Sequence, residues 1–160
     1  MIRTISISDA EYPEILKKMH SPPKVLHING SFKEDDDFAV AIVGSRRASR
    51  YGIEMGEQLG YDLAMRGVTV VSGMARGIDS AAHRGALKAN GRTIAVMGSG
   101  HDHIYPPENR DLYKKIAESG AVISEFENGV SPLPRNFPIR NRIISGLSLG
   151  IVIVEAAKNS

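Results

Sequence analysis

The sequence contains no cysteine and no tryptophan, and only 6% of its 160 residues are aromatic. Without cysteine, the chain has neither disulfide bridges nor thiolate metal sites. The low aromatic content argues against a broad base-stacking platform like that of RNA-recognition domains. Twenty basic and eighteen acidic residues give a formal net charge of +2. An anion site must therefore come from local clustering of charge rather than from the overall balance.

Long apolar runs are missing as well. The N-terminal segment MIRTISISDAEYP lacks the apolar stretch of a secretory signal peptide. The most apolar tract lies near the C-terminus, where Ser145, Gly146 and Ser148 interrupt it. It is shorter than the roughly 18 residues that a membrane span needs. We therefore expect a cytoplasmic protein without a membrane partner.

What is present divides into a short N-terminal extension, residues 1–37, and a larger domain, residues 38–160. In the extension, Ser8 and Glu11 have capping-box spacing, which predicts a helix over residues 7–19. The segment KVLHING predicts a short strand that ends in an Asn-Gly turn. The charged segment KEDDD, residues 33–37, predicts a solvated link to the larger domain.

In the larger domain, apolar runs of strand length alternate with helical segments. The runs AVAIV, TVVS, TIAVM, AVIS and GIVIV are continuous, which predicts parallel strands with both faces buried. Three long helical segments lie between them, with Gly67, Gly91 and Gly120 at their C-terminal ends, and RNRIISGLS predicts a shorter fourth helix. The alternation predicts an α/β fold, a Rossmann-like, doubly wound, mainly parallel sheet with helices on both faces.

Basic and glycine-rich segments follow several of these strands, at the sheet edge where such folds bind ligands. GSRRASR follows the first core strand, SGMARGID the second, and the arginine-rich segment PRNFPIRNR comes after the fourth. Glycines let the backbone approach a phosphate, a helix start offers unpaired N–H groups, and arginines bind phosphate oxygens. With Phe137 as one stacking position, the set predicts a groove for several phosphates of a polynucleotide. A mononucleotide would need fewer cations.

Enzymatic motifs are weaker. The dinucleotide and P-loop glycine patterns are missing, so no cofactor is expected. The G-x-S-x-G match at residues 146–150 precedes a strand, whereas a nucleophile elbow follows one. Glu125 and Glu155 lie near strand ends, where they fit acid–base groups or side chains that hold an arginine or a backbone amide. We favour the second interpretation for both glutamates.

Several polar residues have two interpretations. His101 and His103 flank Asp102 without a third ligand nearby, and we favour a polar loop over a metal site. His83 stands among alanines on a helix, which favours a structural role. Tyr105 fits either a packed turn residue or an aromatic at the rim of the groove. A further acidic residue, Asp79, is expected to cap the helix that follows it.

The same segments carry a resemblance to a known family. The chain is similar to the DNA-processing protein A family (DprA, also called Smf) in these motifs, which occur in the family's order: YPEIL, PPKVLHING, VGSRRAS, VSGMARGIDSAAHRGAL, IAVMGSG, YPPENRDLY, ISEF and FPIRNRIISGLS. The resemblance implies an extended Rossmann domain that binds single-stranded DNA without catalytic turnover. It also implies help in loading a RecA-type recombinase during natural transformation. The residues that the family motifs place at the DNA are Arg46, Arg47, Gly73, Arg76, Gly77, Phe137, Arg140, Asn141 and Arg142.

The resemblance has a boundary. Family members usually continue after the last strand into a Ser-Gly-Thr segment, a further helix and further strands, so the chain resembles a truncated copy of the domain. The family's homodimer and recombinase contacts lie largely in that further part. An alternative function is that of a nucleotide phosphoribohydrolase, which also binds phosphate on glycine-rich loops. It ranks second because its P-G-G-x-G-T segment is missing. A third alternative is a remnant that no longer binds.

Overall fold

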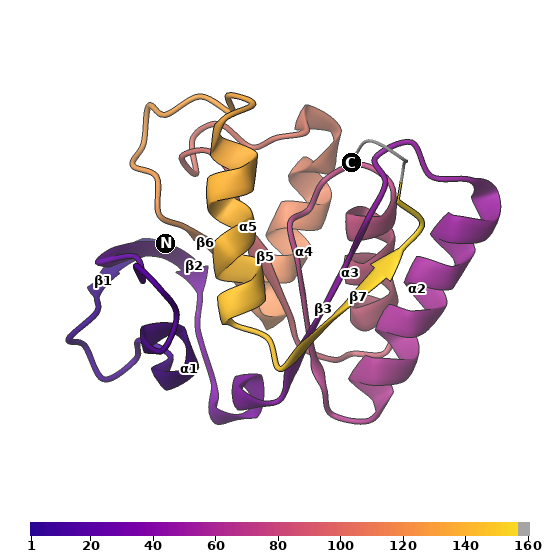
Figure 1. The fold of residues 1–160 in the computed structure, drawn as a ribbon, viewed down its shortest axis with the longest axis horizontal. Coiled ribbons are helices and arrows are strands. Elements are labelled where there is room, and N and C mark those ends of the chain that lie inside the picture. Colours follow the sequence, from indigo (N-terminus) through magenta and orange to yellow (C-terminus); the bar gives the residue numbers. More distant parts are fainter. Residues whose placement is uncertain (157–160) are drawn as a thin grey trace.

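Seven strands form one sheet in the computed structural model, which describes residues 1–156 (Figure 1). The strands are β1 (Ile2–Ser6), β2 (Val25–Gly30), β3 (Ala39–Gly44), β4 (Thr69–Ser72), β5 (Thr93–Val96), β6 (Ala121–Ser124) and β7 (Gly150–Val154). Their order in the sheet is β1-β2-β6-β5-β4-β3-β7. The strands from β6 to β7 are parallel, whereas β1 and β2 pair antiparallel at the other edge. The predicted mainly parallel sheet is confirmed.

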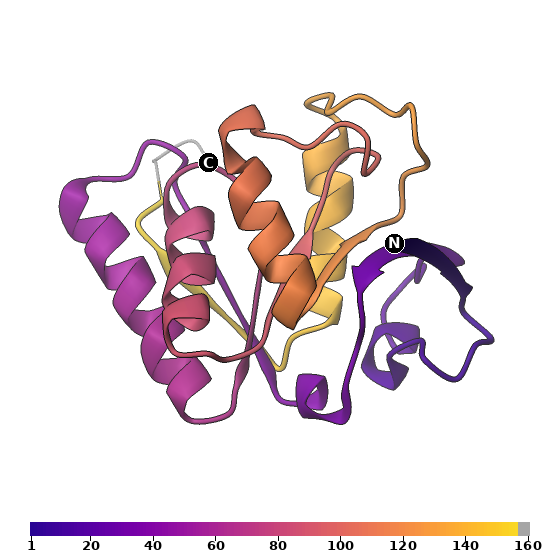
Figure 2. The ribbon, with the colours of Figure 1, turned by 180° about the vertical axis from the view of Figure 1, so that it is seen from behind.

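Helices cover both faces of this sheet. They are α1 (Glu14–Lys17), α2 (Arg50–Met65), α3 (Ile78–Lys88), α4 (Arg110–Ser119) and α5 (Asn136–Gly146), with short 3-10 turns η1 (Glu34–Asp37) and η2 (Pro107–Asn109). Figures 1 and 2 show α2, α3 and α4 on one face and α1 and α5 on the other. This is the doubly wound arrangement that the sequence predicts. No helix within residues 1–156 has the length and apolarity that crossing a membrane would require.

The direction in which successive strands are added to the sheet reverses at β3, which lies between β4 and β7. From β3 the chain adds β4, β5 and β6 in one direction, and α5 then carries it back to place β7 on the other side of β3. In doubly wound sheets, the crevice at the carboxyl ends of the strands around such a reversal is the usual ligand site.

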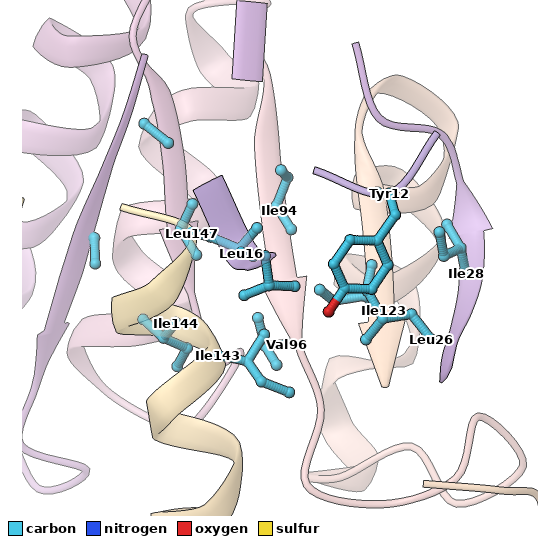
Figure 3. Packing of buried hydrophobic residues seen from close by; sticks show 14 of the residues in the cluster. Tyr12, Leu16, Leu26, Ile28, Ile94, Val96, Ile123, Ile143, Ile144 and Leu147 are labelled. Atoms are coloured by element: carbon cyan, nitrogen blue, oxygen red, sulfur yellow. The ribbon is translucent and has the colours of Figure 1, made fainter. Parts of the chain in front are cut away.

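A buried cluster on the α5 side joins the N-terminal extension to the rest of the fold. Figure 3 shows Leu16 of α1 and Leu147 after α5 lying against Ile94 and Ile123 of the sheet. Tyr12 is 1% exposed, its hydroxyl donates to the Pro23 carbonyl at 2.7 Å, and burial raises its pKa to about 12. The division at residue 37 stays a prediction, but the extension shares this core.

The predicted helix over residues 7–19 is wrong in length. Only α1, four residues long, is helical there. The carboxylate of Glu11 binds the Arg3 guanidinium with oxygen–nitrogen distances of 2.6 and 2.7 Å, and therefore does not form a capping box with Ser8. The Asp9 carboxylate instead accepts from the Ser6 N–H at 2.7 Å and closes a turn after β1. The sequence did not predict β1.

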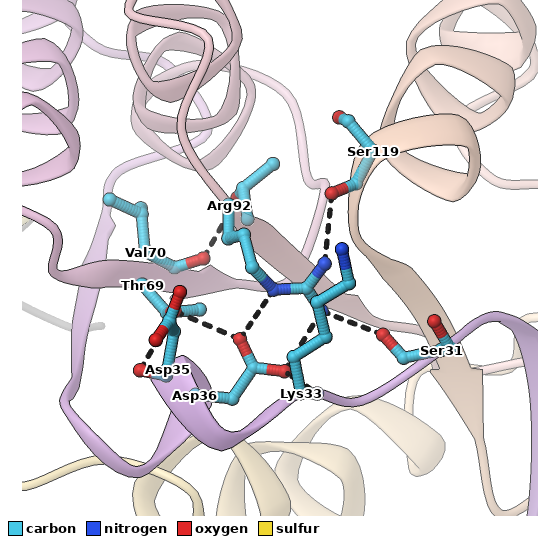
Figure 4. Close-up of polar contacts among 9 residues, drawn as sticks. Ser31, Lys33, Asp35, Asp36, Thr69, Val70, Arg92 and Ser119 are labelled. Atoms are coloured by element: carbon cyan, nitrogen blue, oxygen red, sulfur yellow. Dashed lines mark hydrogen bonds and ion pairs between the residues drawn. The ribbon is translucent and has the colours of Figure 1, made fainter.

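The prediction of a solvated link is confirmed for the exposed residues Lys33, Glu34, Asp35 and Asp37. It is wrong for Asp36, which forms a buried ion pair in η1 (Figure 4). Asp36 accepts from Arg92 Nε at 2.7 Å and from Arg92 Nη2 at 2.8 Å. The same guanidinium donates to the carbonyl oxygens of Ser31 and Ser119, at 2.6 and 2.9 Å. Arg92 therefore joins η1, the start of β5, the end of α4 and the segment after β2.

The strand β7 departs from the expectation that both faces of every core strand are buried. That expectation holds for β4, β5 and β6. In β7, however, Ile151 is 47% and Ile153 65% exposed. The strand lies at the sheet edge with only β3 beside it within the described chain, and α5 leaves this part of the face uncovered.

The ends of the long helices agree with the glycine expectations except at one position. Gly67 follows α2 with a φ of +79°, the left-handed conformation in which glycine is favoured. After α3, Asn90 takes this conformation with a φ of 55°, one residue before Gly91. Asparagine tolerates it better than other side chains do, because its short amide bonds locally. Gly120 is the C-cap residue of α4, as expected.

Candidate nucleic-acid interface

The loop between β4 and α3, residues 73–77, is held by buried side chains from outside the loop. Asp79 was expected to cap α3, which is wrong, because α3 begins at Ile78 with Gly77 as its N-cap. The Asp79 carboxylate accepts from the Gly73 N–H at 3.0 Å. Burial raises the pKa of Asp79, and the positive charge of Arg140 opposes that shift.

The middle of the loop has an unusual backbone conformation. Met74 has a φ of 56°, a left-handed conformation that is uncommon for a residue with a long side chain. Its N–H donates to His83 Nε2 at 3.2 Å, and its carbonyl accepts from Asn109 Nδ2 at 2.9 Å. Both partners are buried. These bonds preorganise the loop backbone before any ligand arrives, and they confirm a structural role for His83.

His83 also predicts a pH dependence of stability. Because Thr93 Oγ1 donates to the Val70 carbonyl, His83 Nδ1 donates to Thr93 at 2.7 Å and the ring is neutral. Burial lowers the pKa of His83 from 6.5 to about 3. The unfolded chain therefore binds this proton more readily, and stability from His83 is present above about pH 6.5 and lost as the pH falls toward 3. We expect this residue to contribute up to about 1.4 kcal/mol per pH unit in that window.

The measurement is urea unfolding of the wild type and His83→Gln between pH 3.5 and 7. Glutamine does not titrate, and its amide oxygen can accept from Met74 N–H. The variant should lose part of the acid sensitivity. His20→Gln, an exposed control, should keep the wild-type slope. Equal slopes in all three proteins would contradict the role of His83.

The helix predicted over RNRIISGLS is confirmed, but it begins four residues earlier than expected, since α5 already begins at Asn136. Pro138 is tolerated there because the first helical turn needs no N–H donor. Asn136 Nδ2 donates to the carbonyls of Gly98 and Ser131, at 3.0 and 2.9 Å. These bonds fix the start of α5 against the loop after β5.

Arg140 is the most deeply placed arginine of the segment. It is 4% exposed, and its Nη1 donates to the carbonyls of Gly73 at 2.9 Å and Val96 at 2.7 Å. Its Nε donates to Asn141 Oδ1 at 3.0 Å. Burial lowers its pKa to about 10, so the guanidinium stays charged at neutral pH. Arg140 therefore ties α5 to the ends of β4 and β5.

The remaining arginines differ in whether an acidic partner already neutralises them. Arg142 binds Glu125 through two contacts of 2.6 and 2.8 Å. Arg76 binds Glu108 at 2.7 and 3.1 Å on the surface. Arg46 and Arg47 are exposed, and neither forms an ion pair within the described residues. These two are the cations of the site that remain available to a phosphate.

The two glutamates considered as acid–base groups are both engaged. Glu125 holds Arg142, as described above, and Glu155 accepts from the Ser49 N–H and hydroxyl, both at 2.5 Å. The interpretation that these carboxylates hold an arginine and a backbone amide is confirmed.

A pocket of about 330 Å³ brings most of the predicted residues together. Its walls come from the ends of β3, β4 and β5 and from α5, and its lining residues are Arg46, Arg47, Gly73, Ala75, Arg76, Tyr105, Phe137 and Arg140. Of the other predicted residues, Asn141 faces a neighbouring pocket and Gly77 caps α3. Arg142 is directed to Glu125 instead. We call the pocket lined by Arg46 and Phe137 the arginine pocket.

Phe137 organises the cations of the arginine pocket. The Arg46 guanidinium carbon lies 4.7 Å from the centre of its ring and that of Arg140 5.2 Å. The Tyr105 ring lies beside it, with 5.9 Å between ring centres, and Arg76 lies 5.6 Å from the Tyr105 ring. Such contacts are worth about 0.5–1 kcal/mol at exposed sites. Tyr105 is thus a rim aromatic, and Phe137 holds Arg46 in place.

The His101–Asp102–His103 segment lies apart from these arginines. His101 is buried, with Nδ1 2.7 Å from the Tyr113 hydroxyl and Nε2 2.8 Å from the His27 carbonyl. His103 Nδ1 lies 3.0 Å from Asp102 Oδ1 at the surface. Across residues 1–156, no three histidine or acidic side chains converge as metal ligands would.

Comparison with known proteins gives consistent relatives. The chain is 46% identical to Protein Smf of Escherichia coli over 155 residues, which are 96% of this chain and 41% of that protein. It is 40% identical to the DNA processing protein DprA of Streptococcus pneumoniae, over 98% of this chain and 55% of that protein. The chain thus spans about half the length of these curated relatives or less.

Solved structures agree with the sequence comparison. The X-ray structure of DprA from Streptococcus pneumoniae matches with a TM-score of 0.89 at 39% identity, over 99% of this chain and 56% of that one. A DprA structure from Helicobacter pylori, described by its single-stranded DNA binding mode, matches with a TM-score of 0.88 at 32% identity, over 99% of this chain and 71% of that one. The family model for DNA recombination-mediator protein A matches residues 3–160. The chain belongs to the DNA recombination-mediator protein A family, which includes the DprA and Smf proteins.

Proposed function

We propose that the chain binds single-stranded DNA through its phosphates at the arginine pocket, without catalytic turnover. The observation that carries this proposal is the placement of two unneutralised arginines, Arg46 and Arg47, beside a preorganised loop and the start of α3. The start of α3 adds the positive end of a helix dipole. The DNA binding described for the Helicobacter pylori relative supports the choice of ligand.

The predicted residues take different roles in this proposal. Arg46 and Arg47 contact phosphates directly, while the backbone of residues 73–77 approaches the strand closely. Phe137 orders Arg46 and stacks on one base. Arg140 holds the walls of the pocket, because its guanidinium already donates to the Gly73 carbonyl and to Asn141 Oδ1. Arg142 acts through its ion pair with Glu125, which fixes α5.

We further propose that the protein acts in the cytoplasm, where it would pass the bound strand to a RecA-type recombinase during DNA uptake and natural transformation. A homodimer of the family domain would place two such grooves in one assembly. Size-exclusion chromatography with light scattering, with and without oligonucleotide, tests the homodimer. A strand-exchange assay with a purified recombinase tests the loading.

The enzymatic alternative, a nucleotide phosphoribohydrolase, has less support. It requires a carboxylate that is free to act on the nucleoside, and both candidate glutamates are already bonded to protein groups. Release of free base from a nucleoside monophosphate, abolished by Glu125→Ala, would revive it.

The deciding experiment is titration of the chain into labelled oligo-dT at several salt concentrations. If about four to six phosphates are contacted, the slope of log K against log salt should be roughly −3 to −4 for a single strand. Duplex DNA of the same length is expected to bind more weakly. Arg46→Ala should reduce the slope by about 0.7, while Arg110→Ala, an exposed change on α4, should not. A slope of log K against log salt near zero would contradict the proposal.

A second experiment addresses Phe137. Replacing it with alanine should weaken binding of oligo-dT by about 1–3 kcal/mol, because a base loses its stacking surface. The double variant with Arg46→Ala should show a coupling of about 0.5–1 kcal/mol, since Phe137 also holds that guanidinium. Phe38→Ala, at the opposite end of β3 and 68% exposed, is the control. Additive effects of Arg46 and Phe137 would contradict the coupling.

A further inference from the structure

Arg76 lines the arginine pocket, yet an acidic side chain already neutralises its charge. Glu108 of η2 accepts from Arg76 Nε at 2.7 Å and from Arg76 Nη2 at 3.1 Å, so both carboxylate oxygens are engaged. The guanidinium also lies 5.6 Å from the centre of the Tyr105 ring. A guanidinium binds a carboxylate and a phosphate with the same two-pronged geometry. Glu108 therefore occupies the position that two phosphate oxygens would take on Arg76.

The ion pair is not what fastens η2 to the loop after β4. The neighbouring residue Asn109 does this, because its buried Nδ2 donates to the Met74 carbonyl and to Ser80 Oγ, both at 2.9 Å. The Arg76 and Glu108 side chains, by contrast, are 50% and 57% exposed. Exposed ion pairs contribute little to stability, so they open at low cost. The carboxylate thus stays close to Arg76, but another anion can displace it.

The backbone places Arg76 beside a cation that is still free. Gly77 packs directly on the preceding loop, because an added Cβ would clash with the Ser45 carbonyl oxygen. The Ile78 N–H donates to the same oxygen at 3.3 Å. The segments that carry Arg76 and Arg46 are therefore in contact, and both arginines line one pocket. A strand held by Arg46 brings its next phosphates close to Arg76 at a high effective concentration.

We propose that Arg76 is a third phosphate-binding cation of the arginine pocket and that Glu108 competes with the strand for it. In the free protein the carboxylate neutralises Arg76, and on binding a strand phosphate takes the place of the carboxylate on the guanidinium. Glu108 therefore lowers the affinity for single-stranded DNA. The inference rests on the proposed function, since the competitor is a phosphate of the bound strand. A carboxylate that only held the loop would have the opposite effect, because its removal would weaken binding.

The test is titration of the full 160-residue chain and its variants into labelled oligo-dT at several salt concentrations. Glu108→Gln keeps the size of the side chain and removes its charge. Asp111→Asn is the matched control, because Asp111 is exposed, lines the same groove between α3 and α4 as Glu108, and forms no ion pair among residues 1–156. Arg76→Gln, alone and combined with each of these changes, shows whether Glu108 acts through that arginine. Urea unfolding verifies that every variant folds.

We expect Glu108→Gln to tighten oligo-dT binding by roughly two- to fivefold, within the range of an exposed ion pair. Asp111→Asn should stay close to the wild type. Arg76→Gln should reduce the slope of log K against log salt by about 0.7. In that background, Glu108→Gln should gain no more affinity than Asp111→Asn does.

Unchanged or weaker binding by Glu108→Gln would overturn the inference and leave the proposed function standing. An equal gain in Asp111→Asn, or a larger gain from Glu108→Gln that persists without Arg76, would do the same. A wild type that does not bind oligo-dT, or binds it without salt dependence, overturns both.

Discussion

Replacing Arg140 with alanine is expected to lower the free energy of unfolding by about 3–5 kcal/mol, because two buried carbonyls lose their donor at about 1–3 kcal/mol each. These are the carbonyls of Gly73 and Val96. The substitution also removes the positive charge that opposes the raised pKa of Asp79, which is 5% exposed. When a buried acceptor loses its partner, the free energy of unfolding falls by more than the net contribution of the hydrogen bond, because the acceptor stays desolvated.

The same variant should weaken binding of single-stranded DNA, since the loop at residues 73–77 loses one of its anchors. Because Arg140 is buried, we expect its loss to change the salt slope less than the loss of Arg46 does. Urea unfolding and oligo-dT titration measure the two effects on one preparation, with Arg110→Ala as the control. A different result would show that Arg140 contacts the strand directly. In that case the variant would bind more weakly, its free energy of unfolding would be unchanged, and its salt slope would fall as much as that of Arg46→Ala.

Replacing Arg92 with alanine is expected to cost a similar 3–5 kcal/mol of unfolding free energy. The ion pair with Asp36 is buried, with the two side chains 14% and 8% exposed. Its removal leaves the Asp36 carboxylate with Thr69 Oγ1 as its remaining side-chain donor. Arg92 precedes β5, at the end of the sheet opposite the arginine pocket. The folded variant should therefore bind single-stranded DNA with wild-type affinity.

Urea unfolding checks the stability and oligo-dT titration well below the unfolding midpoint checks the affinity. Arg50→Ala is the matched control, because Arg50 also forms an ion pair, with Glu54, but is 94% exposed. Surface pairs of this kind contribute about 0–1 kcal/mol. If Arg92→Ala costs no more than Arg50→Ala, the buried network of Figure 4 does not stabilise the fold as argued.

The sheet could be predicted because its central strands are buried on both faces and therefore appear as continuous apolar runs. The N-terminal extension could not, since its structure depends on partners far along the chain. Glu11 has the spacing of a capping residue, but Arg3 on β1 binds it instead. Asp36 appears solvated among its acidic neighbours until Arg92 is brought beside it.

The membership of the arginine pocket follows from the rule for strand ends, but the role of each arginine does not. The missed signal is the helical period of α5. Arg140 lies four residues after Asn136 and three and four before Ile143 and Ile144, and all four residues are buried. Residues at this spacing share one helix face. Arg142 lies off that face and reaches Glu125 instead.

The antiparallel pairing of β2 with β6 has a consequence for how the chain folds during synthesis. β2 leaves the ribosome early, yet its inner neighbour β6 is made only after β3, β4 and β5. Until then β1 and β2 form at most an isolated hairpin, which is marginally stable in water. The apolar side chains Leu26 and Ile28 stay uncovered during that interval. The N-terminal segment therefore carries uncovered apolar side chains until β6 has been made.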